Sequence, residues 1–423
     1  MMRNVIDYLD REDVMRAIAG TSNAKTSESE RGGLVPGLLM VILALVLALC
    51  ALSLVARSAA GAATLPPGFE QKRVASDISK PTTMAFAPDG RLFVAEQTGR
   101  LRVINRRDDL VARPFIDLSR IVASGGERGL LGVAFDPNFR DNQYVYLYFT
   151  RNATATQPVH NRIVRFTADG NEAVPGSGKL ILRLNNLSED KLNHNGGALH
   201  FGEDGKLYVA VGENANPKNA QSFKNLLGKM LRINKNGSIP KDNPFYDREG
   251  VKGKNKAIWA RGLRNPYTFA VRPGEGTIFI NDVGQQTWEE INRGVAGANY
   301  GWPYYEGSER FEDSPPPPAG FQHRKPIYSY RQDNTRPGGE CAITGGTFYN
   351  PQTVQFPARY VGDYFFADFC AGWIRTYDPG TQTVSNFAKG ASLPVDLKVD
   401  HAGRLYYLER GSGSVYRVEH PGG

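Results

Sequence analysis

A recurring pattern of strands runs along the chain from Phe69 onward. Each unit has an alternating apolar strand, a turn rich in Asp, Pro and Gly, a second strand, a polar turn and a third strand. Residues 81–104 (PTTMAFAPDGRLFVAEQTGRLRVI) and 395–418 (VDLKVDHAGRLYYLERGSGSVYRV) match almost position for position. This period of two residues predicts β-strands, because successive side chains of a strand point to opposite faces. Long helical periodicity is absent from this region, so we predict an all-β fold.

Six related units joined by long, variable connections are typical of a six-bladed β-propeller. A β-sandwich would not repeat its hairpin so closely, and a solenoid would keep a shorter and stricter period. A propeller must close its ring, and residues 69–76 can supply the strand that completes the last blade. We therefore predict one propeller over residues 69–423. Its long insertions, 214–245 and 301–339, are expected to lie on the face that carries a ligand site.

A different pattern precedes the strands. Residues 34–56 (LVPGLLMVILALVLALCALSLVA) carry no charge and are long enough to cross a bilayer. We predict an uncleaved transmembrane helix there, with residues 1–33 as a polar cytoplasmic segment and residues 57–68 as a linker to a propeller outside the cytoplasm. The small residues after the apolar run, SAAGAAT, favour the alternative of a long cleaved signal peptide and a secreted domain.

The charge pattern argues against a nucleic-acid site. The chain has 423 residues and a formal net charge of +8, but its basic residues alternate with acidic ones throughout. No block of Lys and Arg marks a phosphate-binding surface.

Cysteine is scarce in this chain. Cys50 lies within the apolar run, which leaves Cys341 and Cys370 as a possible pair. In an exported domain a disulfide is expected from them. The alternative is two small buried hydrophobic side chains with free thiols.

Candidate chemistry lies in residues 193–213, NHNGGALHFGEDGKLYVAVGE. This stretch reads as a hairpin with a tight turn at Asp204-Gly205. The start of the first strand and the end of the second lie at the same end of a hairpin. His194 and Glu213 are therefore expected to be neighbours. An imidazole beside an orienting carboxylate is what a general base requires.

Five motifs together resemble the soluble quinoprotein glucose/sorbosone dehydrogenases. They are GERGLLGVAFDPNF, NHNGGALHFGEDGKLYVAVGE, LGKMLRINKNGSIPKDNPF, RGLRNPYTFAV and GQQTWEEINRGVAGANYGWP. The resemblance covers the chain from about Phe69 to its end. It implies a six-bladed propeller that binds pyrroloquinoline quinone (PQQ) and calcium, and that oxidises an aldose or related sugar by hydride transfer to the quinone. A sugar substrate and an unidentified electron acceptor are the partners that it implies.

The resemblance also implies roles for individual residues. His194 falls at the family's catalytic base, and Glu213 at the carboxylate that orients it, where the family usually has Asp. Arg264 and Asn265 match residues that contact the quinone oxygens, and a fixed guanidinium would stabilise charge that develops there. The alternative for Arg264 is a salt-bridged structural arginine.

Three further positions concern the cofactor and the metal. Gly284 and Gln285 match the pair whose backbone carbonyls hold calcium, with Gln in place of the family's common Pro. Glu127 falls at a cofactor-binding position where the sugar-oxidising members carry Gln. A carboxylate there would repel an anionic cofactor unless calcium or Arg128 compensates for its charge. The neighbouring pair Glu289 and Glu290 is expected to be solvated or at a blade edge.

The chain departs from the family near its C-terminal end. Cys370, Leu393 and Val395 stand where glucose-oxidising members place a lysine and two arginines against the cofactor's carboxylates. The segment ADFCAGWIRTY is similar to the branch of hedgehog-interacting-like propellers. Substitute charge would have to come from residues such as Arg359, Arg375 or Lys398. The alternative function is therefore a non-catalytic propeller, outside the cytoplasm, that binds a glycan or a protein partner.

Overall fold

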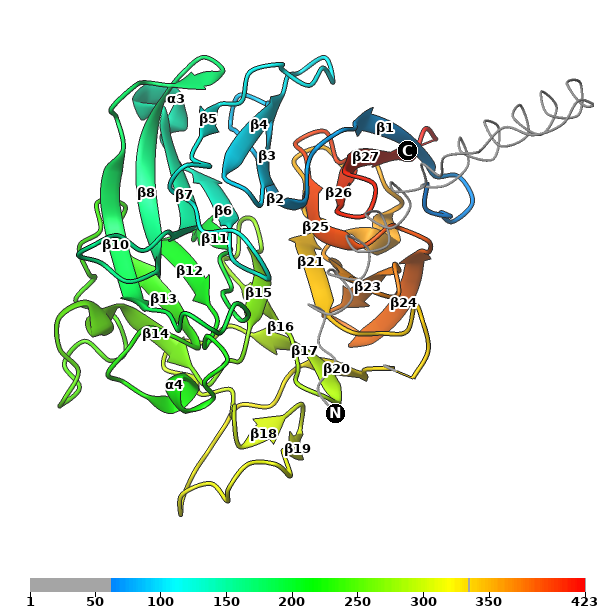
Figure 1. Ribbon diagram of the computed structural model, residues 1–423. Helices are drawn as coiled ribbons and strands as arrows, with labels where there is room; N and C mark the ends of the chain where they lie inside the picture. The colour runs from blue at the N-terminus through cyan, green and yellow to red at the C-terminus, as the bar shows by residue number, and fades with distance from the viewer. Residues whose placement is uncertain (1–61, 334, 423) are drawn as a thin grey trace, which may run out of the picture. The chain divides into compact units, whose positions relative to one another are not determined.

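Six blades follow one another along the chain in the computed structural model (Figure 1). The structure describes residues 62–333 and 335–422. The chain divides into the units Met1–Ala62 and Ala63–Gly423, and the propeller belongs to the second. The predicted membrane segment, 34–56, lies outside the described residues. Within the described part of the chain, no helix has the length and apolarity needed to span a bilayer.

Each blade is built on four antiparallel strands, which in blades 1 to 5 follow in chain order from the axis outward. Blade 1 consists of β2 (Pro81–Phe86), β3 (Leu92–Glu96), β4 (Arg100–Ile104) and β5 (Ile116–Asp117). Blade 2 consists of β6 (Leu130–Phe135), β7 (Tyr144–Arg151), β8 (His160–Asp169) and β10 (Lys179–Asn186), with β9 (Glu172–Ala173) beside β8. Blade 3 consists of β11 (Leu199–Phe201), β12 (Leu207–Val211), β13 (Lys229–Ile233) and β14 (Ile258–Arg261).

The second half of the ring repeats this plan. Blade 4 consists of β15 (Pro266–Val271), β16 (Ile278–Asp282), β17 (Trp288–Arg293) and β20 (Tyr328–Arg331). Blade 5 consists of β21 (Ile343–Phe348), β22 (Tyr364–Asp368), β23 (Ile374–Asp378) and β24 (Thr383–Ala388). Blade 6 consists of β25 (Pro394–Val399), β26 (Leu405–Glu409), β27 (Ser414–Glu419) and β1 (Glu70–Ala75). The short elements outside the blades are α3 (Phe139–Asn142), α4 (Lys218–Gln221), η1 (Gly253–Ala257), η2 (Ala358–Tyr360) and the hairpin β18 (Tyr305–Glu306) and β19 (Glu309–Arg310).

The ring closes in two ways. The first strands of successive blades contact one another from β2 through β6, β11, β15, β21 and β25, and β25 contacts β2 again. In addition, β1 pairs antiparallel with β27, and Glu70 lies opposite Glu419 (Figure 1, blue beside red). Phe69 fixes this closure, because its ring packs edge-on against Phe356 at 4.7 Å and Phe387 at 5.1 Å between centroids. The predicted closing strand is therefore confirmed.

The core lies between the blades. The second strand of each blade is buried along both of its faces, and β3 and β12 have no exposed residue. This differs from a sheet with one wet face, because a neighbouring blade covers each side. Within each blade the first hairpin needs a tight turn, and Gly90 supplies the backbone φ of +89° after Asp89.

One face of the ring carries the candidate residues. In every blade the loop that enters the first strand and the loop that leaves the second strand meet at the same edge, because the two strands are antiparallel. We call this edge the site face. The prediction for insertion 214–245 is wrong in part, since β13 interrupts it and residues after Ile233 leave from the opposite edge. Insertion 301–339 does reach the site face, where Glu306 bonds the loop after β16.

Candidate active site

His194 and Glu213 form a short buried pair on the site face. His194 enters β11 and Glu213 follows β12, so the hairpin brings them together as its topology predicts. The Nδ1 atom of His194 lies 2.6 Å from Oε1 of Glu213, and the side chains are only 8% and 1% exposed. His194 has a positive φ of 57°, and its backbone N–H donates to Glu127 at 2.7 Å. His194 is therefore held through both its backbone and its side chain.

Burial sets the protonation of this pair. Burial first, and the charge of Arg264 second, lower the pKa of His194 to about 3. Burial raises the pKa of Glu213 to about 7. The imidazole is thus neutral near pH 7, and where Glu213 is ionised its carboxylate accepts the proton of Nδ1. Nε2 has no hydrogen-bond partner among the described residues and is the nitrogen that can accept a proton.

Glu127 ties three blades together. Its Oε2 accepts the N–H of His194 and, at 3.0 Å, the amide of Asn265. The Asn265 Oδ1 in turn accepts the N–H of Gly196 at 3.1 Å. Arg128, the expected counter-charge, instead donates to the carbonyl of Lys191 at 2.9 Å. The Glu127 carboxylate therefore accepts its hydrogen bonds from His194 and Asn265 and not from Arg128.

Arg264 is a fixed, buried guanidinium at the entrance to β15. Its Nη1 donates to the Val283 carbonyl at 3.0 Å and its Nε to Oε1 of Gln285 at 2.9 Å. The guanidinium carbon lies 5.7 Å from the centroid of Trp302. Its side chain forms no ion pair with a carboxylate of the described residues. The geometry thus differs from that of a salt-bridged structural arginine, because the positive charge is held by neutral acceptors.

The loop after β16 presents oxygens that lack protein donors. The carbonyls of Gly284 and Gln285 accept no hydrogen bond from the described part of the chain. Below them Oε1 of Glu306 accepts four consecutive backbone N–H groups, beginning with Gln285 at 2.7 Å. Its Oε2 and the Nε1 of Trp302 are buried without a partner, and both residues line one small pocket with Arg264. No sequence pattern pointed to Glu306, because it lies in an insertion without strand periodicity.

Calcium would have to rest mainly on these carbonyls. Among residues 62–333 and 335–422, no three His, Cys, Asp or Glu side chains are grouped so as to hold a metal ion. The two free carbonyls and Oε2 of Glu306 are hard oxygen atoms of the kind that calcium prefers. The quinone end of the site, with Arg264 beside these oxygens, therefore fits the cofactor and the metal.

The expectation for Glu289 and Glu290 is wrong. Both are buried, and Glu289 accepts the N–H of Ile343 at 2.9 Å and the amide of Gln332 at 2.6 Å. Burial raises the pKa of Glu289 to about 8. Neighbouring residues of a strand point to opposite faces, and here a blade or an insertion covers each face.

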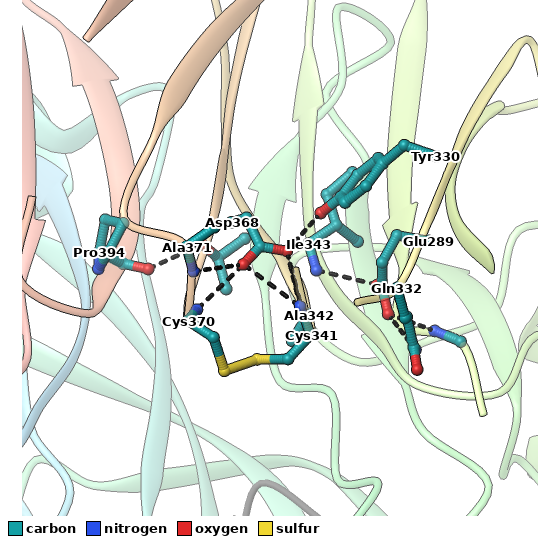
Figure 2. Close-up of a disulfide and its surroundings, with 12 residues drawn as sticks. Glu289, Tyr330, Gln332, Cys341, Ala342, Ile343, Asp368, Cys370, Ala371 and Pro394 are labelled. Atoms are coloured by element: carbon teal, nitrogen blue, oxygen red, sulfur yellow. Dashed lines mark hydrogen bonds between the residues drawn. A yellow bond between two sulfur atoms is a disulfide. The ribbon is translucent and has the colours of Figure 1, made fainter. Parts of the chain in front are cut away.

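Cys341 and Cys370 form a disulfide that joins the start of β21 to the end of β22, which confirms the pair (Figure 2). The bridge encloses the buried carboxylate of Asp368. That carboxylate accepts backbone N–H groups on both sides of the bridge and the hydroxyl of Tyr330 at 2.8 Å. The position expected for a cofactor-binding lysine is therefore occupied by a cross-link.

The three residues expected to supply substitute charge have other contacts in the described part of the chain. Val395 is only 2% exposed, which leaves an apolar side chain at its position. The guanidinium of Arg375 packs on the ring of Trp373 at 3.9 Å, and the ammonium of Lys398 donates to Asp396. Arg359 lies 4.8 Å from the centroid of Tyr360. The end of the site that would face the cofactor's carboxylates therefore fits the cofactor less well than the quinone end does.

Three comparisons show which proteins this chain is similar to. The quinoprotein glucose dehydrogenase B of Acinetobacter calcoaceticus is 30% identical over 56% of this chain and 53% of its own length. The aldose sugar dehydrogenase of Escherichia coli is 30% identical over 64% of this chain and 71% of its own. The crystal structure of the soluble E. coli aldose sugar dehydrogenase in its apo form matches with a TM-score of 0.70 and 25% identity, over 83% of this chain and 99% of that one.

A relative of a different kind is the mouse hedgehog-interacting protein, which is 28% identical over 50% of this chain and 33% of its own length. The chain thus spans about half the length of the Acinetobacter relative and a third of the mouse one. The family model of the glucose/sorbosone dehydrogenases matches residues 78–392. With its six-bladed ring and most of its length inside that match, this chain belongs to the glucose/sorbosone dehydrogenase family.

Proposed function

We propose that this protein is a PQQ- and calcium-dependent dehydrogenase that oxidises an aldose or a related sugar. The single observation that carries the proposal is the buried pair of His194 and Glu213, 2.6 Å apart, which leaves Nε2 of His194 able to take a proton. When bound, PQQ would supply a two-electron acceptor and calcium would polarise it.

The residues divide the work between proton and charge. Nε2 of His194 takes the proton of the hydroxyl on the anomeric carbon, while Glu213 holds the opposite proton on Nδ1. Arg264 holds a positive charge where negative charge develops, and the groups that accept its side-chain hydrogen bonds are neutral. Asn265 and Glu127 keep the loops of blades 2, 3 and 4 in register around the pair.

The cofactor would bind mainly through its quinone end. Arg264 and Asn265 would contact the quinone, Glu127 would lie beside it, and the carbonyls of Gly284 and Gln285 would hold calcium. Cys370, Leu393 and Val395 offer no cation to the cofactor's carboxylates. We therefore expect weaker binding of PQQ than a site with three cations would give.

The remaining features complete this proposal. Residues 34–56 would anchor the protein in a membrane, or direct its secretion, with the propeller outside the cytoplasm. A disulfide accords with an oxidising compartment. Electrons from the sugar would leave through an external acceptor.

The experiment is a titration of the purified protein with PQQ in the presence of calcium, followed by visible spectroscopy after an aldose is added. We expect saturable PQQ binding and bleaching of the quinone by the sugar. His194→Ala should bind PQQ and fail to bleach it. The absence of PQQ binding at micromolar concentration, or equal bleaching in His194→Ala, would refute the proposal.

A second function has its own observation. The three positions without cations, and the similarity to the hedgehog-interacting protein, favour a propeller that binds a glycan or protein partner without catalysis. It would be supported by retained binding of a glycan to a protein that takes up no PQQ. The same titration therefore separates the two functions.

A further inference from the structure

A second cleft, of about 570 Å³, lies next to the pair of His194 and Glu213 on the site face. Its walls are the loop that follows β10 and the loop that follows β12, and Asn214 joins them by bonds to Ser188 and Lys191. Asparagine dominates the lining, which includes Asn185, Asn186, Ser188, Lys191, Asn216 and Asn225. The cleft is large enough for a sugar ring.

The lining has a surplus of hydrogen-bond donors. The Oδ1 atoms of three asparagines already accept protein donors: Asn185 from the N–H of Leu226 at 3.1 Å, Asn186 from Arg183 at 2.8 Å and Asn225 from the N–H of Leu227 at 2.9 Å. The amide nitrogens of Asn185 and Asn186 have no acceptor among the described residues. Asn185 and Asn186 therefore leave their N–H groups, and not their oxygens, available to a ligand.

Lys191 is the one charged residue among the described residues that line the cleft. The ammonium of Lys191 has no carboxylate partner in the part of the chain that the structure describes, and no carboxylate lines the cleft. Glu189 and Asp190 belong to the same loop but are not lining residues. Lys191 precedes His194 by three residues, and its charge acts on both members of the pair, behind the larger effects of burial and of Arg264.

A ligand for such a cleft must supply acceptors and negative charge. Neutral sugars carry hydroxyls that donate as well as accept, and they leave a cation without a partner. A carboxylate only accepts and matches an ammonium flanked by amide N–H groups.

We propose that this cleft binds the carboxylate of a uronic-acid unit attached to the aldose whose anomeric carbon faces His194. The substrate would be an acidic oligosaccharide with its reducing end at the catalytic pair. This inference rests on the proposed dehydrogenase function for the oxidation, but the binding itself requires neither PQQ nor turnover.

The test is calorimetric titration of the full-length protein with cellobiouronic acid, with cellobiose as its neutral counterpart. We expect the acid to bind at least about tenfold more tightly, because a charge-assisted hydrogen bond contributes about 1.5–3 kcal/mol. Lys191→Met should abolish this preference. Lys218→Met removes an exposed lysine from α4, outside the cleft, and should preserve it.

Each other outcome is decisive. Equal affinity for the two disaccharides, no binding of either, or an undiminished preference in Lys191→Met would overturn the inference. Inorganic phosphate that binds as tightly as cellobiouronic acid would show a site for free anions and would overturn it as well. A preference for the acid without quinone reduction would refute the enzyme and support the cleft. Reduction by aldoses without the preference would do the reverse.

Discussion

Replacing Glu213 by Gln should switch the proton of His194 to the wrong nitrogen. Glu213 accepts two donors: Oε1 faces Nδ1 of His194, and Oε2 accepts the backbone N–H of Asn216. A glutamine has one oxygen and one NH2 group for these two positions. The N–H of Asn216 can only donate, whereas a neutral imidazole can carry its proton on either nitrogen. The amide should therefore turn its NH2 group toward His194, and Nε2 should become protonated.

The size of the effect follows from two costs. Leaving the Asn216 N–H without an acceptor would cost about 1–3 kcal/mol, so the productive orientation falls roughly 10-fold to 100-fold in population. The glutamine also cannot stabilise the imidazolium that forms when His194 takes a proton. That loss of a charge-assisted bond is about 1.5–3 kcal/mol, again roughly 10-fold to 100-fold. Together they predict a fall in kcat of about a thousandfold.

The assay is aldose oxidation by the PQQ-loaded protein with an artificial electron acceptor, at equal cofactor occupancy. Glu213→Asp is the matched control, because it keeps both carboxylate oxygens with a shorter side chain, and it should retain more than about a tenth of kcat. A structural readout is independent of activity: the 15N chemical shifts of the His194 imidazole should show the Nδ1–H tautomer in the native protein and the Nε2–H tautomer in Glu213→Gln. A kcat for Glu213→Gln within tenfold of the native protein, or an unchanged tautomer, would refute the reasoning.

Three other predictions concern the frame of the site. Removing the disulfide in the double variant Cys341→Ala/Cys370→Ala should lower the free energy of unfolding by about 3–4 kcal/mol, because the bridge closes a loop with a separation of 29 residues. An unchanged midpoint of urea denaturation would contradict this prediction. Glu289 keeps its proton in the folded state up to a pKa of about 8 and loses it near 4.5 when unfolded, so stability should fall as pH rises from 5 to 8. In Glu289→Gln this fall should be smaller by up to about 4 kcal/mol at 1.4 kcal/mol per pH unit. An equal change in unfolding free energy between pH 5 and pH 8 in the two proteins, measured by urea denaturation, would exclude the effect. Arg264→Lys should weaken PQQ binding at least about tenfold, since an ammonium cannot make the forked contacts of a guanidinium. The control Arg113→Lys changes an exposed arginine and should leave PQQ binding unchanged. Equal PQQ titration curves for the two variants would show that Arg264 does not contact the cofactor.

Local patterns were sufficient to predict the blades and the central pair. The repeated hairpin determines which ends of neighbouring strands meet, so the approach of His194 to Glu213 follows from sequence order and strand direction. The closing strand before residue 76 follows from the need of the last blade for a partner. These features depend on short-range geometry that repeats around the ring.

Contacts between distant segments could not be predicted in the same way. Glu306 reaches Gln285 from an insertion that has no regular period, and the sequence does not indicate where such an insertion folds back. Glu289 and Glu290 are polar neighbours on a strand, which is typical of an exposed edge. Their burial depends on blade 5 and on the insertion that cover the two faces of β17.

The joint between β1 and β27 has a consequence for the order of assembly. Because Glu70 pairs with Glu419, β1 has no strand partner until nearly the whole chain has been synthesised. Such a closure makes the last step of folding a long-range one, which is slow compared with forming a hairpin. It also means that the chain ends could lie in another blade without changing the ring. A circular permutant that joins the present ends of the propeller and opens a turn between two other strands should assemble the same six sheets.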